Sequence, residues 1–158
     1  MPLIQLTTKI SAPISTVFDL SRSIDLHKIS TQHTIEEAIA GRTSGLINFG
    51  ESVTWRAKHF GVYQTLTSKI TAFENPNFFV DEMQSGIFKS FKHQHLFSEE
   101  QNATVMTDIF EYQSPFGILG KLADKLFLKM YMTQLLEKRN QTIKVFAESN
   151  RWEEVLSK

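Results

Sequence analysis

The stretch SPFGILGKLADKLFLKMYMTQLLEKRNQTIKVFAES, residues 114–149, decides the fold class. From Phe116 to about Ser149 its apolar residues recur at three- and four-residue spacing, and Pro115 and Gly117 mark the start of a helix. A helix of roughly 30 residues is about 45 Å long, longer than most helices of a single domain. Such a helix needs a broad apolar partner, which the concave face of a long sheet can supply.

The sequence before this helix is rich in strand patterns. Residues 3–10 alternate apolar and polar side chains, and two short helical segments follow, after Pro13 and around 23–30. Further strand patterns cover 34–40, 51–59, 62–73, 78–84, 87–97 and 104–113, separated by turn sequences. We predict one α+β domain over 1–158 with a helix-grip fold. It has a seven-stranded curved antiparallel sheet around a long C-terminal helix, with two short helices between strands 1 and 2.

Composition excludes several classes of function. Lys plus Arg and Asp plus Glu balance at 17 each, so the chain lacks the net positive field of a nucleic-acid-binding protein. The absence of cysteine excludes disulfides, a Cys-type zinc site and a thiol nucleophile. No basic leader before an apolar stretch, no membrane-spanning apolar run and no GxGxxG, P-loop, HExxH or GxSxG motif occurs. We expect a cytoplasmic protein without a membrane span.

Several segments resemble a known superfamily. They include AGRTSGLI (40–47), VTWRAKHFG (53–61), QTLTSKI (64–70), FVDE (79–82), FKHQHLF (91–97), MTDIFEY (106–112) and SPFGILGKLADKLFLKMYM (114–132). They resemble the START-like or SRPBCC superfamily, which includes polyketide cyclases, plant pollen-allergen lipid carriers and steroidogenic lipid-transfer domains. Within it they look like a bacterial ligand-binding branch often labelled cell-division inhibitor. The resemblance implies a helix-grip container, but carriers, enzymes and regulators share that fold.

Strand alternation predicts a polar group inside the container. If the rings of Phe91 and Phe97 point inward, His93 and His95 share their face, because side chains two residues apart point to the same side of a strand.

The two neighbouring strands add carboxylates to this face. Asp81 accompanies the apolar Phe79, and Asp108 accompanies Phe110 and Tyr112. The predicted ligand-binding residues are Trp55, Gln64, Phe79, Asp81, Phe91, His93, His95, Asp108, Phe110, Tyr112, Phe127 and Tyr131.

Three interpretations of the two histidines and two aspartates stay open. They can be buried groups that satisfy each other. They can orient the polar end of an apolar ligand. They can also carry chemistry, as metal ligands or as a general acid and base, and an enzyme would then use His93, His95, Asp81 and Asp108. No spacing is diagnostic of a metal, so we predict neither a metal nor a cofactor.

The long helix is apolar on more than one side. We predict that Leu119, Leu122, Leu126 and Met130 belong mostly to the core, and that part of the flank formed by Leu128, Met132, Leu135 and Leu136 meets a second copy, in a homodimer, or another partner. His27, at the end of the short helices, can be a residue of the cavity mouth or a helix C-cap group, and we favour the cap. We expect His59 to be a solvated turn residue.

The sequence supports three functions. The first is non-enzymatic binding or transport of a small hydrophobic or aromatic ligand in the cavity between sheet and helix. The second is a cyclase, dehydratase or hydrolase that uses the His and Asp group. The third, which rests on the resemblance, is an interaction module that regulates cell division.

Overall fold

The computed structural model describes residues 1–157. Its elements in chain order are β1 (Leu3–Ile10), α1 (Ile14–Ser21), α2 (Ile24–Ser30), the 3-10 turn η1 (Gln32–Thr34), β2 (Glu37–Gly41), β3 (Ser52–His59), β4 (Val62–Glu74), β5 (Phe78–Ser85), β6 (Ser90–Glu100), β7 (Ala103–Gln113), α3 (Gly117–Ala123), the π-helical turn η2 (Asp124–Leu128), α4 (Lys129–Glu148) and α5 (Trp152–Leu156). The predicted helix-grip fold is confirmed.

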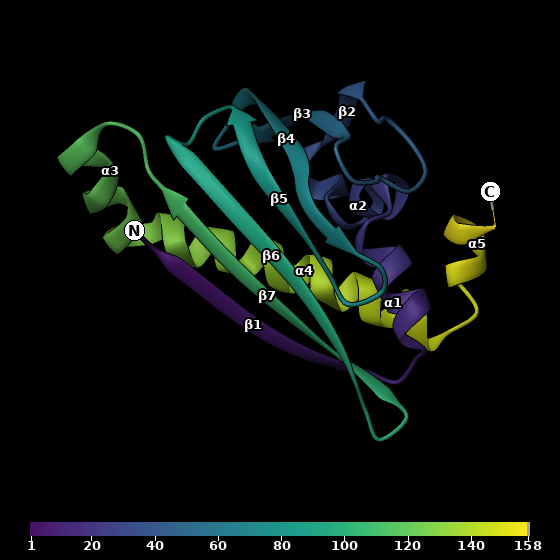
Figure 1. Ribbon diagram of the computed structural model, residues 1–158. Helices are drawn as coiled ribbons and strands as arrows, with labels where there is room; N and C mark the ends of the chain where they lie inside the picture. The colour runs from purple at the N-terminus through teal and green to yellow at the C-terminus, as the bar shows by residue number, and fades with distance from the viewer. Residues whose placement is uncertain (158) are drawn as a thin grey trace.

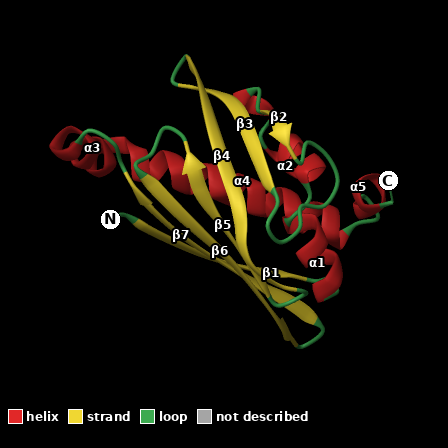
Figure 2. Ribbon diagram, turned by 45° about the horizontal axis from the view of Figure 1, so that its top comes forward, coloured by secondary structure: helices red, strands yellow, loops and turns green. Residues whose placement is uncertain are grey.

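All seven strands form one antiparallel sheet in the order β1-β7-β6-β5-β4-β3-β2. The first strand pairs with the last, and the six later strands follow one another as a meander. The helix α4 crosses one face of this curved sheet, and α1 and α2 lie at the end opposite α3 (Figures 1 and 2). The sheet and α4 thus form the two walls of the predicted container.

The register brings the predicted polar residues together. Across β5 and β6, Asp81 is opposite His93, and across β6 and β7, His95 is opposite Asp108. These are directly paired positions on three adjacent strands, so their side chains lie about 5 Å apart at the backbone end. The three strands alone can therefore assemble a compact polar group.

Some boundaries differ from the prediction. The strand predicted at 34–40 begins at Glu37, because the chain first makes the η1 turn and then places Ile35 in the left-handed region, with φ of 53°. The strand predicted at 87–97 covers Ser90–Glu100. The long helix is interrupted by η2, and α5 follows it unpredicted.

The apolar core has two parts. The larger part lies beneath α1, where the buried ring of Phe18 makes edge contacts with Phe73, Phe79 and Phe97. Burial of such a ring contributes roughly 1.5–3 kcal/mol, so this corner is a strong anchor for the sheet. The smaller part surrounds Tyr112. Among residues 1–157, no helix has the length and apolar character that crossing a membrane requires.

Candidate functional site

A cavity of about 550 Å³ lies between the concave face of the sheet and the C-terminal helix. Most of its wall is apolar, with a few polar groups from several elements. Small-molecule sites commonly measure about 300–1,000 Å³ and have this composition. The fold therefore encloses a space with the size and surface of a small-ligand site.

Most residues predicted from the sequence line this cavity. They are Trp55, Gln64, Phe79, Asp81, Phe91, His93, His95, Phe110, Phe127 and Tyr131. The two others, Asp108 and Tyr112, are fully buried behind the wall. Tyr112 packs against Phe88 and Phe110 in the smaller core cluster, where burial raises the pKa of its hydroxyl.

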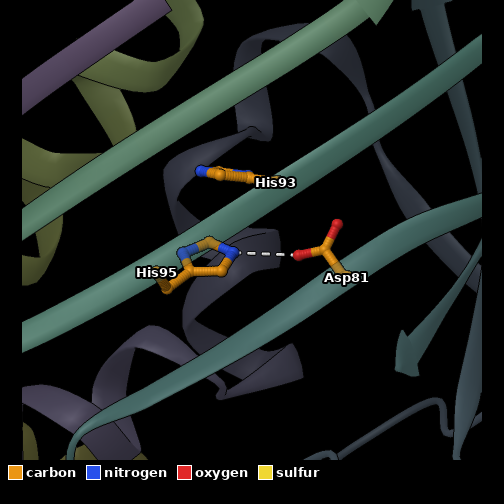
Figure 3. Close-up of side chains that lie close together, drawn as sticks. All are labelled: Asp81, His93 and His95. Atoms are coloured by element: carbon orange, nitrogen blue, oxygen red, sulfur yellow. Dashed lines mark hydrogen bonds and ion pairs between the residues drawn. The ribbon is translucent and has the colours of Figure 1, made fainter. Parts of the chain in front are cut away.

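The predicted polar group is a continuous set of hydrogen bonds. His95 Nε2 donates to Asp81 Oδ2 over 2.9 Å, and His93 Nε2 donates to Asp108 Oδ1 over 2.9 Å. Figure 3 shows Asp81, His93 and His95. The two imidazole rings lie 3.7 Å apart between centroids, and Phe79 stacks on His95 at 4.1 Å. Three strands and an aromatic ring thus fix both histidines.

Two residues of α4 complete this group, which we call the polar cluster: Asp81, His93, His95, Asp108, Arg139 and Asn140. Asn140 Nδ2 donates to Asp108 Oδ2 over 2.7 Å. Arg139 donates to the Asn140 side chain at 2.9 Å, to the carbonyl of Ser21 at 3.1 Å and to Asp108 at 3.4 Å. One of its terminal nitrogens also lies 3.3 Å from His95 Nδ1. The cluster therefore joins α1, α4 and the sheet.

The surroundings set the charges of the cluster. Burial alone would raise the pKa of Asp108, but its hydrogen bonds from His93 and His95 and the charge of Arg139 hold that pKa well below the usual range. Burial would also raise the pKa of Asp81, but the hydrogen bond from His95 and the nearby His93 and Arg139 together outweigh it and lower that pKa. Burial, helped by the nearby His95, lowers the pKa of His93 to about 4. At neutral pH both carboxylates are ionised and His93 is neutral.

The neutral His93 ring and the Asp81 carboxylate both line the cavity, and each keeps an unused hydrogen-bond acceptor. His93 uses its single N–H for Asp108, so its Nδ1 carries a free lone pair. Within residues 1–157, Asp81 has one side-chain hydrogen bond, to His95, and its side chain is 19% exposed. This end of the cavity therefore favours a ligand group that donates hydrogen bonds.

Asp81, His93 and His95 also have the donor types of a divalent-metal site. One ligand atom from each lies within 4.8 Å of the others. However, Asp81 and His95 use such atoms to bond each other, and the Arg139 guanidinium lies beside them. A metal ion would have to replace that hydrogen bond next to a positive charge, so these contacts favour the hydrogen-bonded state.

A second polar group lies nearer the cavity mouth. His27 Nε2 bonds Glu36 Oε1 at 2.9 Å, and its ring lies 4.3 Å from the indole of Trp55 between centroids. Burial alone would raise the pKa of Glu36, but the contact with His27, together with His59 and Thr31, outweighs it and lowers that pKa. The expectation that His27 caps its helix is wrong, because the ring reaches Glu36 across the cavity wall.

The mouth itself is aromatic. His59 Nδ1 and the Tyr131 hydroxyl are hydrogen-bonded at 2.6 Å, which links His59 to the long helix. The expectation that His59 is a solvated turn residue is therefore wrong. Beside it, Phe60 at the tip of the β3–β4 turn contacts Phe127 and Tyr131, with ring centroids 5.7 and 4.6 Å apart. This contact links one edge of the sheet to the helix over the cavity.

The two flanks of the long helix have the opposite roles to those predicted. Leu136 is buried, and Leu128, Met132 and Leu135 line the cavity with it. The set predicted to lie mostly in the core is exposed: Leu119, Leu122, Leu126 and Met130. The inner wall of the container is therefore the flank that the sequence had suggested for a partner.

Comparison with known proteins supports the fold. No family model and no curated protein matches the sequence. Among solved structures, the protein TTHA0849 from Thermus thermophilus has a TM-score of 0.72 and 19% identity, covering 94% of this chain and 100% of that chain. Major latex-like protein 151 from Panax ginseng has a TM-score of 0.68 and 13% identity, covering 94% and 98%.

A START superfamily protein from Mycobacterium smegmatis gives a TM-score of 0.68 and 11% identity, covering 92% of this chain and 97% of that chain. At such identities the likeness shows the fold alone. The chain has the START-like helix-grip fold, which confirms the sequence resemblance at the level of architecture.

Proposed function

We propose that this protein binds a small amphiphilic molecule, whose apolar part fills the cavity and whose polar end donates hydrogen bonds to Asp81 and His93. One observation carries the proposal: an apolar cavity of about 550 Å³ ends at a buried polar cluster with unused acceptors. Apolar walls supply affinity, and a few placed polar groups supply orientation.

The charge of the cluster points to the head group. Both terminal nitrogens of Arg139 already contact protein acceptors, whereas the Asp81 carboxylate faces the cavity with one partner. An ammonium or hydroxyl group gains hydrogen bonds there, and an ammonium also gains the attraction of the carboxylate. A carboxylate head has no hydrogen to donate to Asp81, and the two negative charges would repel each other.

Displacement of a neutral dye tests this proposal. The protein is loaded with Nile red and titrated with decylamine, decanol and decanoate, three ligands with one chain length and different heads. We expect decylamine to displace the dye at the lowest concentration and decanoate at the highest. A charge-assisted hydrogen bond contributes about 1.5–3 kcal/mol, so the amine should bind roughly 10–100 times more tightly than the acid.

The variant Asp81→Asn should remove most of this preference while it leaves Nile red binding intact. Glu82→Gln is the matched control, because the next residue of β5 points to the other face of the sheet. Equal affinity for amine and acid in the wild type contradicts the assigned head group. Failure of all ligands to displace the dye contradicts the cavity as a binding site.

A second candidate function, general acid–base catalysis, is favoured by the His95–Asp81 pair, which is hydrogen-bonded and lines the cavity. Hydrolysis of p-nitrophenyl decanoate by wild type and by His95→Asn tests it. A rate above that of buffer that the substitution abolishes supports catalysis, and equal rates refute it.

The sequence resemblance carries one further proposal, regulation of cell division through surface contacts. Expression of the chain in a rod-shaped bacterium, with cell length as the readout, tests it. Filamentous cells support this role, and cells of unchanged length at the same protein level contradict it.

A further inference from the structure

The N-terminal part of the long helix exposes an unusual amount of apolar surface. Phe116, Ile118 and Leu119 are 80%, 84% and 73% exposed, and Leu122, Leu126 and Met130 are more than half exposed. We call these six residues the α3 face. In both views α3 stands beyond the ends of the strands, where no other element covers it (Figures 1 and 2). A contiguous apolar patch of this kind marks an interaction site.

The backbone holds the α3 face outward by specific contacts. Phe116 adopts a left-handed conformation, with φ of 65°, which is strained for a bulky residue. Gly120 lies against the carbonyl of Pro115, where no side chain fits. Asp124 accepts a hydrogen bond of 2.6 Å from the hydroxyl of Ser114. The turn at 114–115 therefore fixes the direction in which α3 projects.

A row of lysines borders the α3 face. Lys121, Lys125 and Lys129 are exposed and follow one another at four-residue spacing, so they form one stripe along the helix. Ile118, Leu122 and Leu126 repeat at the same spacing and form the adjacent apolar stripe. Asp124 is the one acidic residue within 116–130, and its hydrogen bond to Ser114 ties it to the body of the protein. The chain as a whole has no net charge, so this positive edge is local.

This pattern fits an anionic lipid surface better than a second copy of the chain. A helix with an apolar face and flanking lysines lies in the interfacial layer of a bilayer, apolar side down and ammonium groups at the anionic head groups. A twofold dimer through the α3 face would bring two lysine stripes together, with a single tied carboxylate per chain to offset them. Charge complementarity thus selects the bilayer.

The α3 face is continuous with the cavity. Phe116, Leu119 and Phe127 are each at least half exposed and also line the cavity, so they form its rim. A bilayer against this rim would meet the opening directly. An amphiphile could then pass between membrane and cavity without crossing water.

We propose that the α3 face docks the protein on anionic membranes with the cavity mouth against the lipid. Docking itself does not require the ligand proposed above, whereas transfer of an amphiphile through the mouth rests on that proposed function. The partner is the surface of a bilayer that contains acidic phospholipid, and contact is peripheral and reversible.

Vesicle co-sedimentation tests docking. Full-length protein is mixed with vesicles of phosphatidylcholine alone or with about 30% phosphatidylserine, at about 0.1 M salt. We expect binding to the anionic vesicles, weaker binding to neutral ones, and release as salt rises. Each lysine near an anionic surface contributes about fivefold, so the triple variant K121Q/K125Q/K129Q should lose on the order of 100-fold in partitioning.

Two matched controls separate this surface from general charge and apolarity. The variant K58Q/K69Q/K92Q removes three exposed lysines from strands of the sheet and should keep vesicle binding. Ile118→Ser with Leu122→Ser should abolish binding, whereas Ile39→Ser with Phe49→Ser, two exposed apolar residues elsewhere, should not. Ile118 and Leu122 do not line the cavity, so Nile red binding should persist in that variant.

Each outcome decides the proposal. Equal binding of all variants, or no binding to anionic vesicles, overturns docking, and intact Nile red binding in the same samples shows that the ligand site stands. A dimer in light scattering that Ile118→Ser with Leu122→Ser dissociates also overturns it, because the α3 face would then be covered by a second copy. Circular dichroism of each variant confirms that the fold is retained.

Discussion

Replacement of Arg139 by methionine tests whether the polar cluster holds the container together. The guanidinium contacts the side chain of Asn140, the carbonyl of Ser21 and, at 3.4 Å, the carboxylate of Asp108, and one terminal nitrogen faces His95. It thus connects the long helix to α1 and to two strands. Methionine keeps the apolar stem and removes the charge and all four contacts.

The magnitude follows from what the substitution leaves behind. Asp108 is fully buried, and loss of one partner of a buried ion pair costs about 3–5 kcal/mol. The Arg139–Asp108 contact is long, and Asn140 and His93 still donate to the carboxylate at 2.7 and 2.9 Å. These remaining donors place the expected loss at the lower end, about 3 kcal/mol of the free energy of unfolding.

Urea unfolding at about pH 7, followed by tryptophan fluorescence and circular dichroism, measures this loss. Lys138→Met is the matched control, since it removes the same charge from the preceding, exposed position of α4. Surface changes of this kind usually stay within about 0.5 kcal/mol. A loss for Arg139→Met no larger than that for Lys138→Met refutes the structural role of the cluster.

Three further predictions concern the cluster, the start of α3 and the mouth. Buried His93 has a pKa of about 4, against about 6.5 in the unfolded state, so the unfolded state binds more protons between these values. The free energy of unfolding should therefore fall by about 2 kcal/mol as the pH drops from about 6.5 to 5. His93→Gln should flatten this pH dependence in urea titrations. Gly120→Ala forces a methyl group against the carbonyl of Pro115 and should cost about 1–3 kcal/mol, seen as a lower Tm; an unchanged Tm contradicts the packing. The Phe60 ring contacts Phe127 and Tyr131 over the cavity, so Phe60→Ala should speed Nile red release about 2–10 fold in stopped flow, whereas Phe49→Ala should not. Equal release rates in the wild type and Phe60→Ala contradict a role of this contact in retaining the ligand.

The strand side of the site could be predicted because the side-chain period of a strand is two. Once Phe91 and Phe97 were placed inward, His93 and His95 had to follow, and the same argument placed Asp81. It also placed Asp108 on the right face. It could not show that Asp108 is sealed behind the histidines, because depth depends on which side chains stand in front.

The helix side of the site could not be predicted from periodicity. The segment 116–136 is apolar on two flanks, and the π-helical turn Asp124–Leu128 adds a residue that changes the phase between α3 and α4. The buried face is chosen by tertiary contacts, above all by Arg139 and Asn140 meeting Asp108. These two polar residues stand at helical spacing from Leu136 and Ile143, which was the available signal.

Contacts between residues far apart in the sequence could not be predicted either. His59 and Tyr131 are 72 residues apart, and each has an ordinary interpretation in its own segment. His27 and Glu36 are closer, but the strand predicted at 34–40 includes Thr34, Ile35 and Glu36, where the chain instead completes the η1 turn and places Ile35 in the left-handed region. Polar pairs of this kind are set by the fold and carry no local pattern.

Binding of the ligand's polar end at the cluster is tested by the ¹⁵N spectrum of the histidine side chains during titration with decylamine at about pH 7. We expect the unprotonated Nδ1 of His93 to shift towards the value of a hydrogen-bond acceptor as the amine saturates the cavity, while the exposed His33 stays unchanged. An unperturbed His93 at saturating amine contradicts the claim that the ligand's polar end sits at the cluster.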